Sequence, residues 1–230
     1  RDVRGTSNVG LVTTLFDGGL AFAINNTVLR VFPDGRTERV LGGGSVAPTD
    51  GAVATAVSFA SSGAAIGGDP MHPRVYFERG CSVWYVDLTL GTVHPFAGTG
   101  TCGYTGDDGP ALSANIRAIV DMAVSDSGLV YFSTDISAPD PRPIRVVDTS
   151  GTIRTFVAAD SASPPYDIFN FSNFMAPVPG SEDVVVVASV RNAAYSGARS
   201  AVLRVRPDRS FTVLAGTGTD ETSEGIAGTS

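Results

Sequence analysis

The sequence predicts an all-β protein, a β-propeller built from four-stranded antiparallel blades, and three observations lead to this prediction. The first is a repeat, because segments with similar endings align at Leu41, Phe96, Phe156 and Leu214, at intervals of 55 to 60 residues. The second is that short runs rich in Val, Ile, Phe and Tyr alternate with turn residues. The third is that no segment shows the hydrophobic period of an amphipathic helix.

The third repeat shows its four strands most clearly. "AIVDMAVSD", "LVYFSTD", "PIRVVD" and "TIRTFVA" follow one another between residues 118 and 158. Turn segments such as Asp126–Gly128 and Thr149–Gly151 separate them and supply residues that tolerate positive φ. By extension, the chain is interpreted as four blades, at about 10–43, 57–98, 116–158 and 169–216. Both ends have the composition of a connector between blades, so we expect residues 1–230 to be part of a larger propeller. A closed four-bladed ring is the alternative.

The stretch "FAGTGTCGYTGDDGPALSANI", followed by "MAVSDSGLVYFSTD" and "IRVVDTSGTIRTFVA", resembles the NHL-repeat family of β-propellers. Members of that family carry AGTG and GDGGPA ahead of a Val-rich strand, a "VYxAD" strand and an "RIRxVD" strand. The family's Pro-x-Gly before the first strand is replaced here by Ile119-Val120-Asp121. The resemblance implies that the glycine-rich stretch is a connector between blades. A phosphate-binding loop would need a following helix and usually a Lys.

The composition argues against several classes of partner and cofactor. A formal net charge of −7 opposes a general nucleic-acid binder. No apolar run approaches the length of a membrane span. The two histidines, His72 and His94, are expected on different parts of blade two, so a zinc-dependent lyase is not supported and no cofactor is expected.

The connectors account for the acidic excess of the chain. They lie at about 42–57, 98–115, 158–170 and 216–230 and contain eight acidic residues and no Arg. We expect them to share one rim with the turns between second and third strands, and this acidic rim to attract a basic protein partner or a cation. Ordinary solvated loops are the alternative. The residues proposed for this rim are Asp107, Asp108, Asp220 and Glu221 of the connectors, and Arg191, Tyr195 and Arg199 of a long turn.

Arginines recur at matching positions on the third strands of the blades. Arg30, Arg145 and Arg204 hold these positions, and in the third blade Asp135 closes the preceding strand. We interpret the arginines as structural contacts between strands, and Asp135 is placed where it could reach Arg145.

The two cysteines lie in segments that are expected to emerge on the same rim. Cys81 falls in a turn of the second blade and Cys102 in the connector that follows it, a placement that permits a disulfide. Two free thiols are the alternative. A disulfide would indicate an oxidising compartment, and hence an extracellular or cell-surface protein. Possible glycosylation sites at Asn25 and Asn170 fit this setting.

The function expected from these features is that of a non-enzymatic interaction or structural module, which presents a rigid propeller rim to a protein partner or to further blades or chains. The alternative is a propeller enzyme, lactonase-like or lyase-like, with a central metal site. A cluster of acidic or histidine side chains on the propeller axis would favour the enzyme, whereas apolar walls would favour the module. The fold alone does not decide between them.

Overall fold

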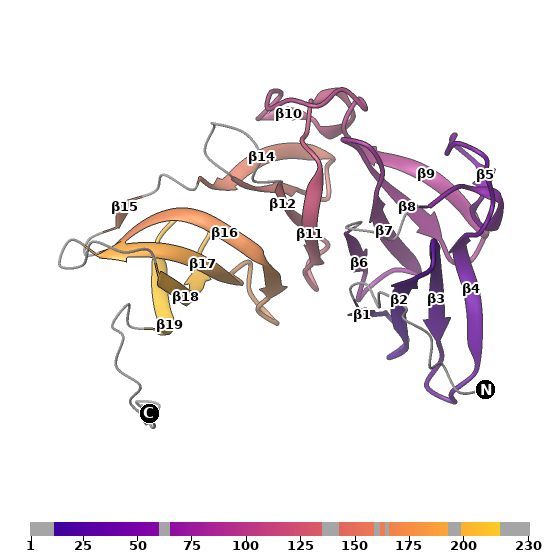
Figure 1. The fold of residues 1–230 in the computed structure, drawn as a ribbon, viewed down its shortest axis with the longest axis horizontal. Helices are drawn as coiled ribbons and strands as arrows, with labels where there is room; N and C mark the ends of the chain where they lie inside the picture. The colour runs from indigo at the N-terminus through magenta and orange to yellow at the C-terminus, as the bar shows by residue number, and fades with distance from the viewer. Residues whose placement is uncertain are drawn as a thin grey trace.

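The computed structural model describes residues 12–59, 65–134, 143–158, 162–163, 166–192 and 199–216. Four antiparallel sheets follow one another along an arc, with the N-terminal sheet at one end and the C-terminal sheet at the other (Figure 1). The helical segments in these ranges are two short 3-10 turns, η1 (Ala54–Ala56) and η2 (Ala111–Ser113). The predicted all-β propeller architecture is therefore confirmed.

The first two blades have consecutive strands as neighbours, as expected for antiparallel hairpins. The first blade contains β1 (Val12–Thr14), β2 (Leu20–Ile24), β3 (Thr27–Val31) and β4 (Thr37–Gly42). The second contains β6 (Ile66–Gly68), β7 (Arg74–Glu78), β8 (Val83–Asp87) and β9 (Thr92–Ala97), and the short connector strand β5 (Ala52–Val53) pairs with β9.

The third and fourth blades repeat this arrangement. The third contains β11 (Ile119–Val124), β12 (Val130–Thr134), β13 (Ile144–Val147) and β14 (Thr152–Val157), with the connector strand β10 (Gly109–Pro110) beside β14. The fourth contains β16 (Tyr166–Pro177), β17 (Val184–Asn192), β18 (Arg199–Val205) and β19 (Phe211–Ala215), with β15 (Ala162–Ser163) beside β16. The strands of the third blade coincide with the predicted segments to within two residues at each end.

Neighbouring blades are held together by apolar side chains between their faces. Between the third and fourth blades, Tyr131 and Phe156 pack edge to face, with their ring centroids 5.1 Å apart. They lie in one cluster with Val184 and Val186 of β17, all of them buried. Aromatic and branched side chains of this kind provide most of the free energy that stabilises such an interface. Each blade thus depends on its neighbour for its core.

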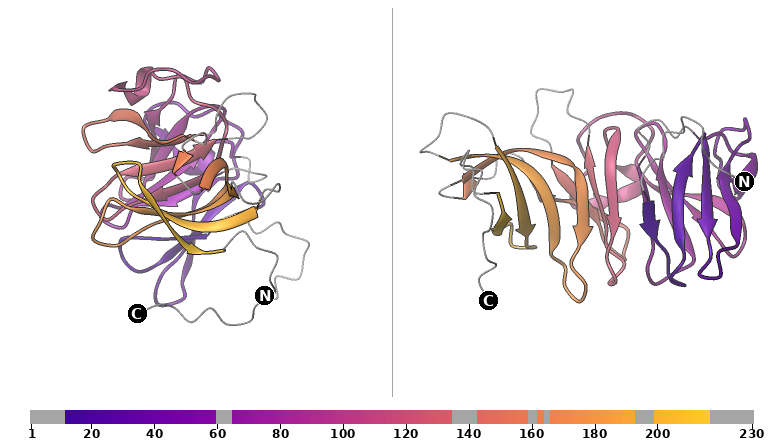
Figure 2. Two further views of the ribbon diagram at one scale, coloured as in Figure 1. Left: turned by 90° about the vertical axis from the view of Figure 1, so that its left-hand side faces the viewer. Right: turned by 60° about the horizontal axis from the view of Figure 1, so that its bottom comes forward.

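The innermost strands β1, β6, β11 and β16 lie next to one another on the concave side of the arc (Figures 1 and 2). Glycines of β6 allow this close approach. A Cβ atom on Gly68 would lie 2.0 Å from the carbonyl oxygen of Thr14, and one on Gly67 would lie 3.1 Å from Cγ of Met122. Since real Cβ atoms do not approach backbone oxygens so closely, Gly68 is required where β6 meets the first blade.

Candidate functional site

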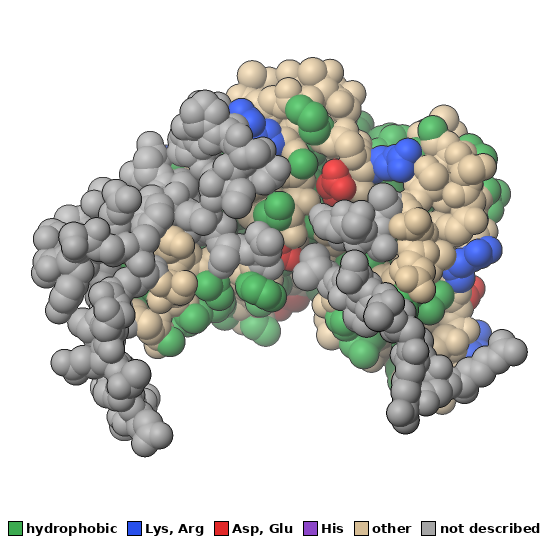
Figure 3. All heavy atoms as spheres, viewed as in Figure 1, with side chains coloured by type: hydrophobic (Ala, Val, Ile, Leu, Met, Phe, Trp, Pro, Cys, Tyr) green, Lys and Arg blue, Asp and Glu red, His purple; other side chains and the backbone are tan. Residues whose placement is uncertain are grey.

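A groove of about 700 Å³ runs along the concave side, lined by the inner strands of all four blades and by part of β17. Its walls are mainly apolar and include Val12, Ile66, Met122, Phe174 and Val185. Figure 3 shows hydrophobic side chains gathered along the edge of the fourth blade that borders the hollow of the arc. A concave, apolar surface of this size is typical of sites that bind small molecules.

Asp121 is the one charged side chain among the described residues that line this groove. It lies on β11, at an irregularity in the pairing of β11 with β12, and only 5% of it is exposed. Its Oδ2 accepts a hydrogen bond from the backbone N–H of Met175, 2.6 Å away on the fourth blade. Its Oδ1 accepts one from the N–H of Met122 at 2.9 Å. The carboxyl group thus joins two blades at the wall of the groove.

Burial raises the pKa of Asp121 to about 6, although the hydrogen bonds from the N–H groups of Met122 and Met175 act in the opposite direction. Removal from water disfavours the charged form of a carboxyl group, and here this effect is the larger. The group consequently changes charge close to neutral pH. Buried carboxyl groups with such pKa values, in a cleft, are typical of functional sites.

Ser133 adds a second polar group next to Asp121. The two residues are directly paired between β12 and β11, so their side chains lie on the same face of the sheet. Ser133 is only 3% exposed. Within the described part of the chain, its hydroxyl has no hydrogen-bond partner. Two buried polar groups therefore interrupt the apolar interface between the third and fourth blades beside the groove.

The raised pKa predicts an unusual dependence of stability on pH. The native state binds a proton at Asp121 more tightly than the unfolded chain, so stability should fall as pH rises from about 4 to 6 and stay lower above that range. Asp121→Asn should abolish this decline, because the amide does not titrate. At pH 8 the gain from removing the buried charge is offset by one backbone N–H, of Met122 or Met175, that loses its acceptor. Urea unfolding between pH 4.5 and 8 measures the effect.

Asp126→Asn is the matched control for that experiment. Asp126 is exposed, and its carboxylate accepts a similar hydrogen bond between blades, from the N–H of Gly180 at 2.7 Å. Because water still reaches this group, its substitution removes a carboxylate between the same two blades but no buried charge, so the decline of stability caused by Asp121 should remain. Equal profiles for the two variants would show that the burial of Asp121 has no energetic consequence.

The residues that the structure describes do not form the central metal site of the enzyme alternative. No three His, Cys, Asp or Glu side chains among them lie close enough together to hold a metal ion. Asp121 contributes a single carboxylate at the groove, fewer than the protein ligands of a zinc or calcium site.

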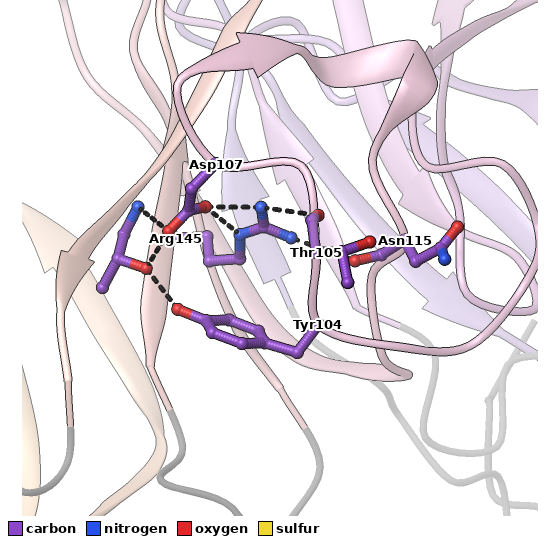
Figure 4. A network of polar contacts seen from close by, with 6 residues as sticks. Tyr104, Thr105, Asp107, Asn115 and Arg145 are labelled. Atoms are coloured by element: carbon purple, nitrogen blue, oxygen red, sulfur yellow. Dashed lines mark hydrogen bonds and ion pairs between the residues drawn. The ribbon is translucent and has the colours of Figure 1, made fainter.

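Asp107, one of the residues expected on a partner-binding rim, is exposed and also takes part in a network within the chain (Figure 4). Its Oδ1 accepts hydrogen bonds from Nε and Nη2 of Arg145, at 3.0 and 2.5 Å, and its Oδ2 accepts one from the N–H of Thr155 at 3.1 Å. The side chain of Arg145 is almost wholly buried, whereas that of Asp107 is one-third exposed. The carboxylate neutralises a buried guanidinium group, which gives it a structural role.

Other groups complete the surroundings of Arg145. Its Nη1 and Nη2 donate to the carbonyl oxygens of Asn115 and Thr105, at 3.1 and 3.2 Å, and the guanidinium carbon lies 5.0 Å from the centre of the Tyr104 ring. The hydroxyl group of Tyr104 forms a hydrogen bond with Thr155. The connector thus supplies the observed partners of Arg145, while Asp135, placed in the sequence where it could reach Arg145, lies outside the described residues.

The preceding connector makes a corresponding contact. Asp50 precedes β5 and η1 by the same number of residues as Asp107 precedes β10 and η2. Its Oδ1 lies 2.6 Å from Nδ1 of His94 on β9, the outermost of the four main strands of the second blade. We call these two contacts, Asp50 with His94 and Asp107 with Arg145 and Thr155, the connector clamps. Each clamp ties a connector to the blade that follows it.

The other residues predicted for the rim are only partly described. Asp108 is exposed and has a φ of 61°, a turn conformation. Tyr195, Asp220 and Glu221 lie outside the described residues, as do the side chains of Arg191 and Arg199.

Cys81 and Cys102 form the predicted disulfide, with their Cα atoms 5.1 Å apart. This confirms that the turn after the second strand and the following connector meet on one rim. Asn25 is exposed in a tight turn with Asn26, both at positive φ, while the side chain of Asn170 is outside the described set.

In the sequence, Asp121 stands out only as part of Ile119-Val120-Asp121, the segment that departs from the family pattern. A carboxylate in the middle of the apolar strand "AIVDMAV" has no structural reason to be there unless it is paired or functional. Which face of the strand it occupies depends on the irregularity beside Val120, and this cannot be derived from the period of the sequence.

No protein-family model matches the chain, and no curated protein matches it in sequence. Solved structures are similar to it in fold. A gluconolactonase from Xanthomonas campestris has 12% identity and a TM-score of 0.45, over 89% of this chain and 74% of that one. Regucalcin from Agrobacterium tumefaciens, described as a calcium-binding protein, has 12% identity and a TM-score of 0.44, over 82% of this chain and 55% of that one. Hydrazine synthase from Kuenenia stuttgartiensis has 13% identity and a TM-score of 0.43, over 93% and 69%.

These neighbours contradict the expectation of a non-enzymatic module. Two of them are named as a gluconolactonase and as regucalcin, a calcium-binding protein. At such identities the similarity extends to the β-propeller fold, and this chain spans little more than half of the regucalcin chain. The similarity to the NHL family in particular is not confirmed.

No helix in the described ranges is long and apolar enough to cross a membrane.

Proposed function

We propose that the chain forms part of a propeller hydrolase that acts on lactones in the groove of the concave side, with Asp121 as its general base. The observation that supports this proposal is the carboxyl group of Asp121 in the wall of an otherwise apolar groove, with a pKa raised to about 6. A general base is most effective when its pKa lies near the working pH. A carboxylate in this position is expected to lower stability at neutral pH, which is a cost typical of functional residues.

The reaction would proceed in two proton transfers. The carboxylate of Asp121 takes a proton from a water molecule as the oxygen of that water bonds to the lactone carbonyl carbon. The protonated carboxyl group then donates this proton to the ring oxygen as the carbon–oxygen bond of the ring breaks, which releases the hydroxy acid. The hydrogen bonds from Met122 and Met175 hold the carboxyl group in place during both transfers.

Lactone hydrolysis by the wild-type chain and by Asp121→Asn tests this proposal. We expect kcat/KM to rise with pH and to be half-maximal near pH 6, because the base must be deprotonated. Asp121→Asn should lower kcat by roughly 100-fold or more, the usual contribution of a general base. Asp126→Asn should retain full activity. Hydrolysis that survives in Asp121→Asn with an unchanged pH profile would refute the role of Asp121.

We further propose that the blades are NHL-like repeats and that the protein works in an oxidising compartment, as an extracellular or cell-surface protein. The first proposal is supported by the "GDDGPA" segment, because its Asp107 binds Arg145 of the "IRVVD" segment, so two parts of the family motif are in direct contact.

The proposal of an oxidising compartment is supported by the disulfide between Cys81 and Cys102. Mass spectrometry of the protein isolated from its native source without reductant tests this proposal, which predicts that neither thiol is alkylated.

A further inference from the structure

The groove exposes apolar side chains from both ends of the arc. Phe174, on β16 of the fourth blade, is 66% exposed, and Val12, on β1 of the first blade, is 57% exposed. Both line the groove, although they belong to the first and last blades. Exposed hydrophobic side chains that border one hollow are typical of a ligand-binding surface.

Hydrogen-bonding side chains are few in the described walls. Besides Asp121, only Thr13 and Thr14 provide polar side-chain atoms among the described lining residues. The hydroxyl oxygen of Thr13 already accepts a hydrogen bond from the N–H of Gly68 at 2.8 Å. A ligand with many hydroxyl groups would lose its hydrogen bonds to water here and find few replacements, and each buried, unpaired hydroxyl weakens binding by roughly tenfold.

The backbone N–H groups of Met122 and Met175 contact the carboxyl group of Asp121, and both residues line the same groove. Methionine is flexible and polarisable, so it adapts to alkyl chains of different length and shape. The wall next to Asp121 therefore suits a hydrocarbon chain that extends from the reacting carbonyl group.

We propose that the substrate is an apolar lactone with an alkyl side chain, and that Phe174 with the neighbouring apolar wall binds this chain. The inference rests on the proposed lactone hydrolysis and names its substrate class. A volume of about 700 Å³ lies within the range of sites for small organic ligands. The walls select against polyhydroxylated sugar lactones, because these cannot exchange their bound water for hydrogen bonds to the groove.

Calorimetric binding to the Asp121→Asn variant tests the substrate class separately from catalysis. The probes are γ-lactones with straight alkyl chains of two to eight carbons, with glucono-δ-lactone as the polar comparison. We expect Kd to fall about fourfold for each added methylene until the groove is filled, as apolar burial predicts. A Kd that does not depend on chain length, or tighter binding of the sugar lactone, would overturn the inference.

Phe174→Ala should weaken binding of the longest lactones about tenfold and leave the shortest nearly unchanged. Leu90→Ala is the matched control, because Leu90 is a similarly exposed apolar residue, 70% exposed, in a turn of the second blade outside the groove. Equal effects of the two substitutions would contradict the assigned role of Phe174. Chain-length-dependent binding without hydrolysis by the wild type would refute the proposed catalysis and retain the binding class. Hydrolysis of lactones without any dependence on chain length would refute the proposed binding class and retain the proposed catalysis.

Discussion

Asp107→Asn is expected to lower the free energy of unfolding by about 3 kcal/mol, because it leaves the guanidinium group of Arg145 buried without a negative partner. The amide can still accept one hydrogen bond, so Asp107→Ala should cost more, up to about 5 kcal/mol. The remaining partners of Arg145, the carbonyl oxygens of Asn115 and Thr105, carry only partial charge. Urea unfolding at pH 7 measures both variants.

Asp108→Asn provides the control at the adjacent position. It removes the same charge from the same connector, but Asp108 is exposed, and Asn tolerates the positive φ of this residue. Its effect should stay within about 0.5 kcal/mol, as for most surface substitutions. If Asp107→Asn and Asp108→Asn were equally mild, the burial of Arg145 would not depend on its carboxylate, and the network in Figure 4 would contribute little to stability.

Removal of the disulfide is the second change with a large expected effect. Cys81 and Cys102 are separated by 21 residues, and in the chain-entropy model a loop of that size contributes about 3 kcal/mol. For a chain of this length, such a loss lowers the melting temperature by roughly 6 to 12 °C. The double variant Cys81→Ser, Cys102→Ser should show this decrease in a thermal unfolding experiment.

Reductant supplies the control for the disulfide. The wild-type protein with reductant should melt at nearly the temperature of the double variant, and reductant should not change the melting of the variant itself. A wild-type melting temperature that is insensitive to reductant, at a concentration shown by thiol alkylation to open the bond, would contradict the stabilising role.

The strands of the propeller could be predicted from the sequence because they depend on local patterns. "IRVVD" and "TIRTFVA" are apolar runs bounded by turn residues, and the structure has β13 and β14 there. The disulfide followed from topology, since a turn after a second strand and a connector emerge on the same rim. Both predictions needed only the order of strands and the alternation of directions.

The site could not be predicted in this way, because it depends on contacts between blades. Asp121 lies next to Met175 of another blade, 54 residues further along the chain. No pattern within either strand specifies that pairing. Asp107 was expected at the surface because it is an acidic residue in a glycine-rich connector. It is exposed there, but its contact with Arg145, 38 residues away, could not be derived from the sequence. Charge in the sequence indicates that a group will be ionised, and only the fold shows that it also contacts a buried arginine.

The connector clamps also define where one module of the molecule ends and the next begins. Asp50 and Asp107 bind the blade that follows them, and the connector strands β5 and β10 pair with that same blade. Consider a gene segment that starts just after the outer strand of one blade and ends with the outer strand of the next blade. It would encode one blade together with the connector that binds to it. Duplication of that segment would add a complete copy without breaking any contact of this kind. Arrays of such blades could thus gain or lose whole copies without losing the contacts of the connector clamps.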